Sequence, residues 1–259
     1  MMHTPRHYPV AALVMDSLAP RRTVPVGGRA HLPTMHGLAE ETAAAVRDQI
    51  AVVRPKLRGW LHLAAAPLAL IAGLVLVLVS STTAGRLGAG VFVGAAAVQY
   101  AVSAAYNIGT YAPRTTLMLR RADHCTIFLL IAGSYTPFAL VLLEGQARTT
   151  LLALAWGGAA AGIVFKVLFP HTHRLISVLP YIGLGWVAVF FLPHFAATAT
   201  TATLLLFITG GVLYSAGLVV YGFRRPNPSV TWFGFHELFH AATLLAFGAH
   251  FTAVAIAVT

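Results

Sequence analysis

Residues 235–258 read FHELFHAATLLAFGAHFTAVAIAV, a stretch that decides the fold class of this chain. Its length suits a helix that crosses a bilayer core of about 30 Å. The ionisable residues within it are Glu237 and three histidines, His236, His240 and His250. A charged side chain at mid-bilayer costs roughly 2.5–3.5 kcal/mol on insertion scales, so ionisable residues in a span usually mark a functional site. The stretch therefore predicts a membrane-spanning helix with a polar site near its start.

His236 and His240 are the first candidates for that site. They are four residues apart and so lie on one face of the expected helix. With Glu237 between them they match the His-Glu-x-x-His signature of zinc sites. Glu237 points about 100° away from this face, so it serves either as a base beside the metal or as a partner for nearby arginines. His250 lies about 15 Å further along the helix, too far to join the same site.

The whole chain has the composition of a polytopic membrane protein. Of its 259 residues, 58% are hydrophobic and 9% are charged. A soluble domain carries about 25% charged residues, so this inventory cannot cover a water-facing surface. The net charge of +10 is spread between apolar blocks, which favours membrane lipids as partners and argues against nucleic acid. The single cysteine, Cys125, excludes an intrachain disulfide and is interpreted as a packing residue.

Seven apolar blocks predict an all-α fold, a seven-transmembrane-helix bundle formed by residues 56–259. The connections between the blocks are short, so no second domain is expected after residue 56. Dense glycine in several blocks is interpreted as generic close packing of membrane helices. The predicted spans are Leu61–Thr82, Leu87–Ile108, His124–Leu143, Thr150–Phe169, Leu175–Leu192, Ala202–Tyr221 and Phe235–Val258.

The basic residues predict a cytoplasmic N-terminus and an outer C-terminus, because Lys and Arg concentrate in cytoplasmic segments. In this orientation the outer side holds Arg86 and Arg148. The inner side holds Arg47, Arg54, Lys56, Arg58, Arg114, Arg120, Arg121, Lys166, Arg174, Arg224 and Arg225.

The residues before the first span predict two different segments. Residues 1–37 hold five prolines and four arginines without a long apolar core, which predicts a disordered tail and no cleavable signal peptide. Residues 38–55 carry apolar side chains on one side of a short helix and charges elsewhere. We interpret this segment as an amphipathic helix that lies on the membrane surface.

The predicted topology brings five polar residues from three spans to one depth in the inner leaflet. Ser103 and Asn107 end the second span, Asp123 precedes the third, and His236 and His240 begin the seventh. These residues are far apart in the sequence, and their common depth follows from the charge distribution alone. The coincidence predicts one site that these residues share.

Most of the polar residues near this depth also have a purely structural interpretation. Asp123 can cap the third helix, where a negative charge is stabilised by the helix dipole. Ser103 and Asn107 can bond helices to one another. His62 and His124 are interpreted as interfacial residues that face the headgroups.

Several short segments together resemble the hemolysin III family, bacterial relatives of the adiponectin and progestin receptors. The resemblance begins near Lys56 and continues to the C-terminus. It depends on the order of these motifs over seven spans rather than on any one of them. The motifs are Arg58–His62, Ser103–Tyr106, Asp123-His124, Ile127–Pro137, Gly185-Trp186, Arg225–Pro228 and Phe233–His240.

The resemblance implies a multi-pass protein of the bacterial plasma membrane with a cytoplasm-facing zinc site. Two metal-binding histidines of the family match His236 and His240, and an aspartate that contacts the metal-bound water matches Asp123. A third histidine ends a Ser-x-x-x-His motif on the second helix, where this chain has Asn107. Family relatives include ceramide hydrolases, so the implied roles are hydrolysis of a lipid amide and membrane homeostasis.

Because of Asn107, the identity of the third metal ligand stays open: an amide is a poor zinc ligand compared with imidazole or carboxylate. Asp123 can ligate Zn²⁺ directly with His236 and His240. His124 can turn towards the metal instead. A third outcome is a weak metal site with a regulatory or structural role.

Two functions follow from these alternatives. The first is a zinc-dependent hydrolase of a lipid amide or ester, in which Asp123 orients or activates water and Ser103 steadies either that water or the developing oxyanion. The second is a non-catalytic membrane homeostasis or receptor-like protein with a degenerate metal site. An intramembrane metalloprotease needs a further acidic ligand, and no acidic residue follows His240. A pore-forming hemolysin ranks lower still, because the spans lack an amphipathic pore-lining pattern.

Overall fold

Helices account for nearly all of the chain that the computed structural model describes, residues 55–170, 172–229 and 231–259. The predicted tail at residues 1–37 and residues 38–54 of the predicted interfacial helix lie outside this range. In the described part, seven helices are long and apolar enough to cross a membrane. This finding confirms the predicted all-α, seven-span membrane fold.

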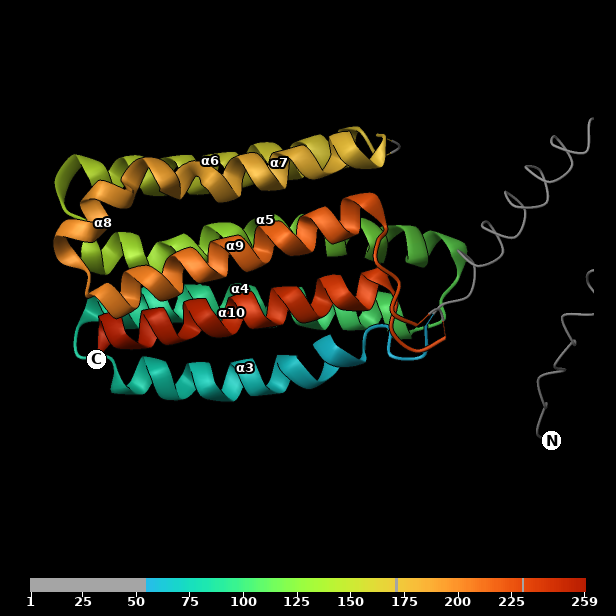
Figure 1. Cartoon of the computed structure of the whole chain (residues 1–259), viewed down its shortest axis with the longest axis horizontal. Helices are drawn as coiled ribbons and strands as arrows, with labels where there is room; N and C mark the ends of the chain where they lie inside the picture. The colour runs from blue at the N-terminus through green and yellow to red at the C-terminus, as the bar shows by residue number, and fades with distance from the viewer. Residues whose placement is uncertain (1–54, 171, 230) are drawn as a thin grey trace, which may run out of the picture. The chain divides into compact units, whose positions relative to one another are not determined.

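The helices follow one another with short connections (Figure 1). The fifth span is built from α7, the 3₁₀ helix η1 and α8 in succession. The elements are α3 (Trp60–Val79), α4 (Thr83–Ile108), α5 (Pro113–Leu142), α6 (Gly145–Leu168), α7 (Arg174–Trp186), η1 (Val187–Phe191), α8 (Leu192–Thr198), α9 (Thr201–Phe223) and α10 (Phe235–Val258).

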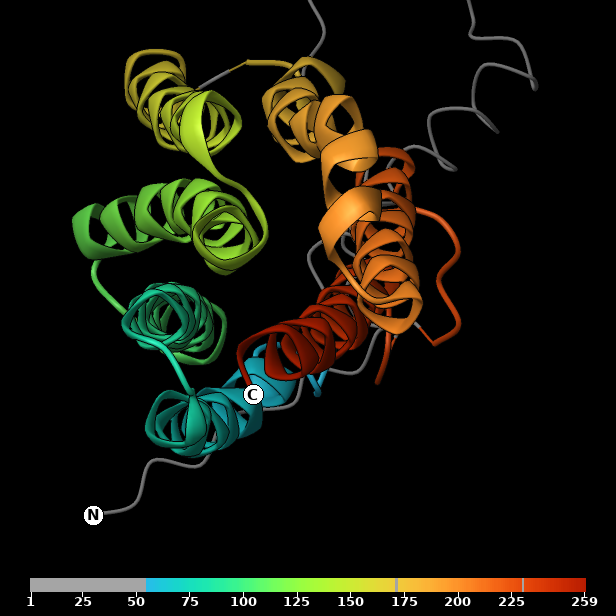
Figure 2. The same cartoon turned by 90° about the vertical axis from the view of Figure 1, so that its left-hand side faces the viewer.

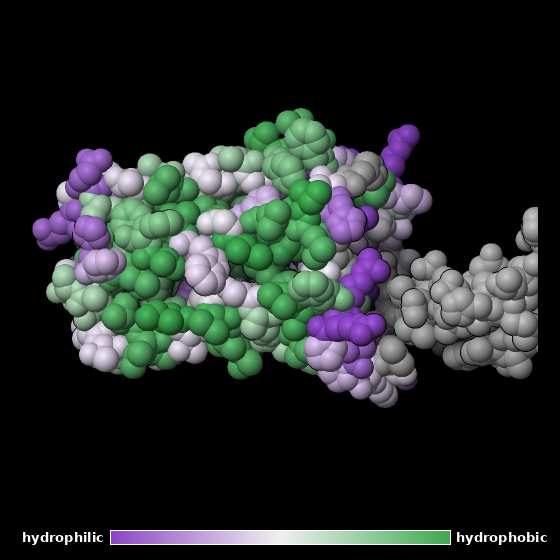
Figure 3. Space-filling model, turned by 45° about the horizontal axis from the view of Figure 1, so that its top comes forward, coloured by the Kyte–Doolittle hydropathy of each residue, from purple (hydrophilic) through white to green (hydrophobic). Residues whose placement is uncertain are grey.

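The seven spans form a closed ring when viewed along the bundle (Figure 2). Each span packs against its neighbours in the sequence, and α10 also packs against α3, α4 and α5. The helices α3, α5, α7 and α10 begin at one end of the bundle, which we call the histidine end; the other is the far end (Figure 1). Hydrophilic residues gather at both ends, with a mostly hydrophobic surface between them (Figure 3), as expected for a bundle that spans a bilayer.

Helix α5 begins eleven residues before the predicted span, at Pro113 instead of His124. Proline is favoured in the first turn of a helix, where its missing N–H has no partner to lose. The first turns are polar, with Arg114, Arg120 and Arg121, so an apolar pattern does not reveal them. Asp123 therefore lies inside the helix, and its interpretation as an N-cap is wrong.

The fifth span changes its helix type where α7 ends at Trp186 and η1 begins at Val187. A 3₁₀ segment alters which carbonyl groups are bonded within the helix. The Tyr135 hydroxyl of α5 reaches these groups, donating to the carbonyl oxygens of Leu184 at 3.1 Å and of Gly185. This contact anchors the irregular part of the span to the most buried helix of the bundle.

Close helix packing at glycine occurs at some of the predicted positions and not at others. A Cβ atom on Gly162 would lie 2.3 Å from the ring of Phe128, so α6 approaches α5 closely there. A Cβ on Gly94 or Gly157 would meet nothing within 4 Å. Generic packing therefore explains only part of the glycine content.

Candidate functional site

The start of α10 is fixed by Glu237, whose side chain is fully buried. Its Oε2 accepts from the Gly234 backbone N–H at 2.8 Å, which caps the helix. Its Oε1 accepts from Arg58 Nε at 3.0 Å, in an ion pair with the segment before α3. Both oxygens have structural partners, so of the two interpretations of Glu237 the structure favours the partner of an arginine.

Backbone bonds hold the same two segments together. Lys56 donates its backbone N–H to the carbonyl of Thr231 at 2.9 Å, and Leu57 donates to that of Trp232 at 3.3 Å. The Lys56 ammonium lies 4.4 Å from the centroid of the Trp232 ring. This pairing places the start of α3 beside the start of α10 and determines which side chains meet there.

His236 and His240 lie next to each other on α10, with ring centroids 4.5 Å apart and an angle of 59° between the rings. His236 is half-buried, whereas His240 is buried, with 2% of its surface exposed. Nδ1 of His240 is buried and has no hydrogen-bond partner among the described residues. The predicted pair therefore faces the interior of the bundle and not the lipid.

His62 is a member of this cluster that the sequence interpretation placed elsewhere. It was expected to face the headgroups, but it is 2% exposed and its ring stacks on His240 at 3.9 Å with an interplanar angle of 12°. Neither of its ring nitrogens has a hydrogen-bond partner in the described part of the chain. Apolar patterning carries no signal for this position. It follows from the pairing of Arg58 with Glu237, which joins the segment before α3 to the start of α10.

Ser103, Asp123, His236 and His240 line one small cavity of about 30 Å³ at the histidine end. Asp123 is buried, and the side chains of Ser103 and Gln99 interact with its carboxylate. The predicted convergence of helices two, three and seven thus brings these four side chains around one space.

Asn107 is buried near this cavity but does not line it. Its amide donates to the Ser103 carbonyl at 2.8 Å and to the Ser103 hydroxyl at 3.3 Å. The side chain at the expected third-histidine position is therefore bonded within its own helix. It orients Ser103 rather than extending towards the histidine pair.

Two further side chains lie at the small cavity. His124, which is predicted to face the headgroups, is half-buried and lines the small cavity. Its carbonyl accepts a hydrogen bond from the Tyr181 hydroxyl at 2.9 Å. Lys166, counted only as an inner positive charge, is buried; its ammonium donates to the Ser177 carbonyl at 2.7 Å and to the Ser177 hydroxyl. Lys166 also lies 4.8 Å from the centroid of the Tyr181 ring. Apolar patterning gave no signal that this lysine points inward.

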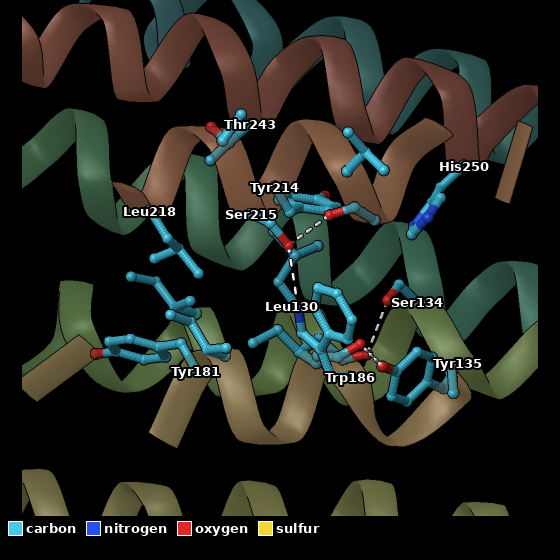
Figure 4. A pocket seen from close by; sticks show the side chains of 18 of the residues that line it. Leu130, Ser134, Tyr135, Tyr181, Trp186, Tyr214, Ser215, Leu218, Thr243 and His250 are labelled. Atoms are coloured by element: carbon cyan, nitrogen blue, oxygen red, sulfur yellow. Dashed lines mark hydrogen bonds between the residues drawn. The ribbon is translucent and has the colours of Figure 1, made fainter. Parts of the chain in front are cut away.

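A second and much larger cavity of about 610 Å³ lies beside the small one. Both are lined by Gln99, Tyr181 and Phe239, so they share part of their walls. Apolar and aromatic side chains from α5, the fifth span, α9 and α10 enclose most of the larger cavity (Figure 4). Its volume lies within the range of cavities that bind small molecules.

The cavity wall reaches the surface between the fifth span and α9. Trp186, Val189, Ile208 and Val212 line the cavity and are also exposed on the outside of the bundle. Across this side, the Trp186 indole N–H donates to the Ser215 hydroxyl at 3.2 Å (Figure 4). These exposed residues would face lipid acyl chains in a bilayer.

The donor set fits a zinc ion only in part. Two imidazoles and a carboxylate are common zinc ligands, and Nδ1 of His240 is a buried atom with an unused lone pair or proton. Among residues 55–170, 172–229 and 231–259, however, no three His, Cys, Asp or Glu side chains are placed so that they could bind one metal ion together. A closed metal site requires at least one side chain to turn.

The fold and the cluster define a class, multi-pass helical membrane proteins whose last helix presents a histidine pair to the bundle interior. The sequence matches the family described as Haemolysin-III related over residues 50–251, and the chain belongs to this family. It is 37% identical over 123 residues to the Hemolysin-3 homolog of Bacillus subtilis (strain 168), covering 47% of this chain and 58% of the relative. It is 38% identical over 109 residues to Hemolysin-3 of Bacillus cereus, covering 42% of this chain and 50% of the relative. The chain thus spans about half the length of the curated relatives that it matches.

Proposed function

We propose that this hemolysin III-type protein hydrolyses an amide or ester bond of a membrane lipid at the histidine end of the bundle. The observation that carries the proposal is the shared wall of the two cavities, the smaller with several polar and ionisable side chains in its lining and the larger mostly apolar. A lipid with its acyl chain in the large cavity has its carbonyl group beside Asp123, His236 and His240. Membrane homeostasis is the physiological role that such an activity would serve.

The exposed cavity wall between the fifth span and α9 supplies a route for the lipid. An acyl chain can pass sideways from the bilayer between Trp186 and Ser215 without entering water. The route requires the hydrogen bond between these two side chains to open. Substrate binding is therefore expected from the membrane and not from the aqueous phase.

His236, His240 and Asp123 are the residues that would hold Zn²⁺, after a side-chain rotation that completes the set. A zinc ion held in this way supplies Lewis acidity towards a carbonyl group. The Asp123 carboxylate is buried beside Ser103 and Gln99. One of its oxygens would bind the metal, and the other would accept a proton from the attacking water and pass it to the departing amine or alcohol as the C–N or C–O bond breaks. The Ser103 hydroxyl, which Asn107 orients through its amide, would turn from the Asp123 carboxylate and donate its one proton to the oxygen on which negative charge develops.

Metal analysis of three purified proteins tests the zinc assignment: the wild type, Asn107→His, and the double variant His236→Ala/His240→Ala. We expect about one zinc per chain in the wild type and in Asn107→His, with tighter binding in the latter, and none in the double variant. Release of fatty acid from a labelled lipid amide in vesicles should occur with the wild type and be lost in the double variant. An equal metal content in the wild type and in the double variant would contradict the assignment.

A non-catalytic role is the second candidate, and the geometry of the histidines favours it. The rings of His62 and His240 stack, and no three potential ligands converge in the described residues. In this case the protein binds lipid and reports its presence, and the imidazoles act as packing groups. The double variant His236→Ala/His240→Ala would then bind lipid as the wild type does and support membrane homeostasis in cells equally well.

We further propose that the histidine end faces the cytoplasm of a bacterial cell, with the plasma membrane as the location. The distribution of Lys and Arg supports this orientation. In a chain with Cys125→Ala, a cysteine introduced at Arg148 should react with an impermeant maleimide in intact cells. A cysteine introduced at Arg225 should react only after permeabilisation, and the reverse pattern would invert the topology.

A further inference from the structure

The part of the large cavity remote from the histidine cluster contains polar atoms in otherwise apolar surroundings. His250 points into it from α10 and Tyr214 from α9, with ring centroids 5.6 Å apart (Figure 4). The His250 ring is buried and stacks on Phe207 at 5.2 Å with an interplanar angle of 11°. Gly210 leaves room for the ring, because a Cβ there would lie 2.1 Å from its Cδ2. The imidazole thus has one orientation.

The hydrogen bond of His250 determines what its other nitrogen offers. Nε2 lies 3.0 Å from the carbonyl oxygen of Phe207. A carbonyl oxygen only accepts, so Nε2 carries the proton and Nδ1 of the neutral ring is an acceptor. Nδ1 has no partner among the described residues, and neither does the buried hydroxyl of Tyr214. An unpaired acceptor and an unpaired donor therefore belong to neighbouring rings in the lining of one mostly apolar cavity, where unpaired polar groups are costly; the hydroxyl of Tyr100 is a third such atom.

A hydroxyl group on a ligand can form hydrogen bonds with both Nδ1 of His250 and the Tyr214 hydroxyl. It donates its proton to Nδ1 of His250 and accepts the proton of the Tyr214 hydroxyl. An alkyl chain leaves both atoms unpaired, and a carbonyl oxygen leaves Nδ1 without a donor. A carboxylate leaves Nδ1 unpaired in the same way and brings a charge that has no cation beside it among the described lining residues.

The position of the two atoms sets where the hydroxyl must be on the ligand. His250 follows His240 by ten residues on one helix, which places it about 15 Å further along the axis, the length of an extended chain of about twelve carbon atoms. We propose that the cavity selects an acyl chain with a hydroxyl group about twelve carbons from its carbonyl, bound by His250 and Tyr214. This inference rests on the proposed function, because it takes the acyl carbonyl to lie at the histidine end.

The test is a competition assay on the full chain in nanodiscs, with a displaceable fluorescent fatty acid as the reporter. The competitors are octadecanoic acid, its analogue hydroxylated at about the twelfth carbon, and its analogue hydroxylated next to the carboxyl group. We expect the mid-chain hydroxyl to bind about tenfold more tightly than the plain chain, because one buried polar pairing is worth about that factor. The hydroxyl next to the carboxyl group should give no gain.

Tyr214→Phe removes one oxygen atom and is the principal variant; His250→Phe is the second. Both should bind the plain chain as the wild type does and lose the preference for the hydroxylated one. Trp156→Phe is the control, because it likewise removes a polar group from an aromatic side chain but at a residue outside the cavity lining, where the indole is bonded to the Thr136 hydroxyl. It should keep the preference.

The outcomes separate this inference from the proposed function. If the plain and hydroxylated chains bind equally to the wild type, or if both variants keep the preference, the hydroxyl site is overturned while acyl binding stands. If no long-chain acid displaces the reporter, acyl occupancy of the cavity fails and the inference fails with it. The same comparison with the chain presented as an N-acyl amide decides whether the substrate or the released acid is the ligand.

Discussion

The first turns of α10 and its second half both carry buried polar side chains, but the partners of these side chains differ. Glu237 has both oxygens bonded, and His240 stacks on His62 beside His236. His250 has one bonded nitrogen and lies among Phe207, Phe138 and Tyr214. In the first region, polar groups from several helices lie together. In the second, a few polar groups are surrounded by apolar side chains.

The difference indicates what each region contributes. A polar group in a membrane bundle is stabilised by partners on other helices, and at the histidine end Glu237 has such partners. Nδ1 of His240 and both ring nitrogens of His62 have none among the described residues. The unpaired atoms near His250 stabilise nothing within the described chain, and a ligand is what satisfies them. Substitution of Arg58 or Glu237 is therefore expected to act through stability, and substitution of His250 or Tyr214 through binding.

The largest expected effect comes from breaking the ion pair at the histidine end. Arg58→Ala leaves the fully buried Glu237 carboxylate without its partner. Removal of one member of a buried pair costs about 3–5 kcal/mol, and we expect the lower value because Arg58 is 20% exposed. The free energy of unfolding in mixed micelles titrated with SDS measures the loss.

Two further variants sharpen this result. Arg58→Ala/Glu237→Gln should be more stable than Arg58→Ala alone, because it removes the uncompensated charge. Arg58→Lys keeps a charge but not the geometry, so an intermediate value is expected. A wild-type unfolding free energy in Arg58→Ala would show that Glu237 is held by its capping bond alone.

The seven spans could be predicted because apolar length alone decides whether a helix can cross a bilayer. The common depth of Ser103, Asp123 and the histidine pair also followed, because the charge distribution fixes which ends of the helices meet. The face that each helix presents could not be predicted in the same way. The inward position of His62 depends on the pairing of Arg58 with Glu237, which joins residues far apart in the sequence.

The early start of α5 and the large cavity escaped prediction for other reasons. The first turns of α5 are polar, so a search for apolar runs begins too late, at His124. A cavity is a volume that neighbouring side chains leave unfilled, which depends on all the helices around it and not on any one motif. Tyr214 and the polar role of His250 therefore appear only in three dimensions.

A smaller effect is expected where α9 meets the second half of α10. Gly210→Ala places a methyl group against the His250 ring, and such overpacking costs about 1–3 kcal/mol. Gly211→Ala is the matched control, because a Cβ there meets nothing within 4 Å and alanine is the better helix former. Unfolding of both variants in mixed micelles gives the comparison. Equal stability of the two would mean that the His250 ring moves freely, contrary to its fixed orientation.

The smallest effect is expected at the surface of the large cavity, where Trp186 and Ser215 join the fifth span to α9. Trp186→Phe removes the indole N–H and keeps an aromatic ring, so the loss is about 0.5–1.5 kcal/mol for one hydrogen bond. If these helices separate to admit a chain, the loss lowers the barrier to opening, and a bound fluorescent fatty acid should dissociate about two to ten times faster.

Two variants identify the source of any change in rate. Ser215→Ala removes the other partner of the bond and should accelerate dissociation by a similar factor. Trp156→Phe removes a comparable bond, from the Trp156 indole to the Thr136 hydroxyl, away from the side where the fifth span meets α9, and should leave the rate unchanged. If all three variants release the probe at the wild-type rate, the chain enters elsewhere. The unpaired atoms near His250 would then mark a site that lipid reaches only from the histidine end.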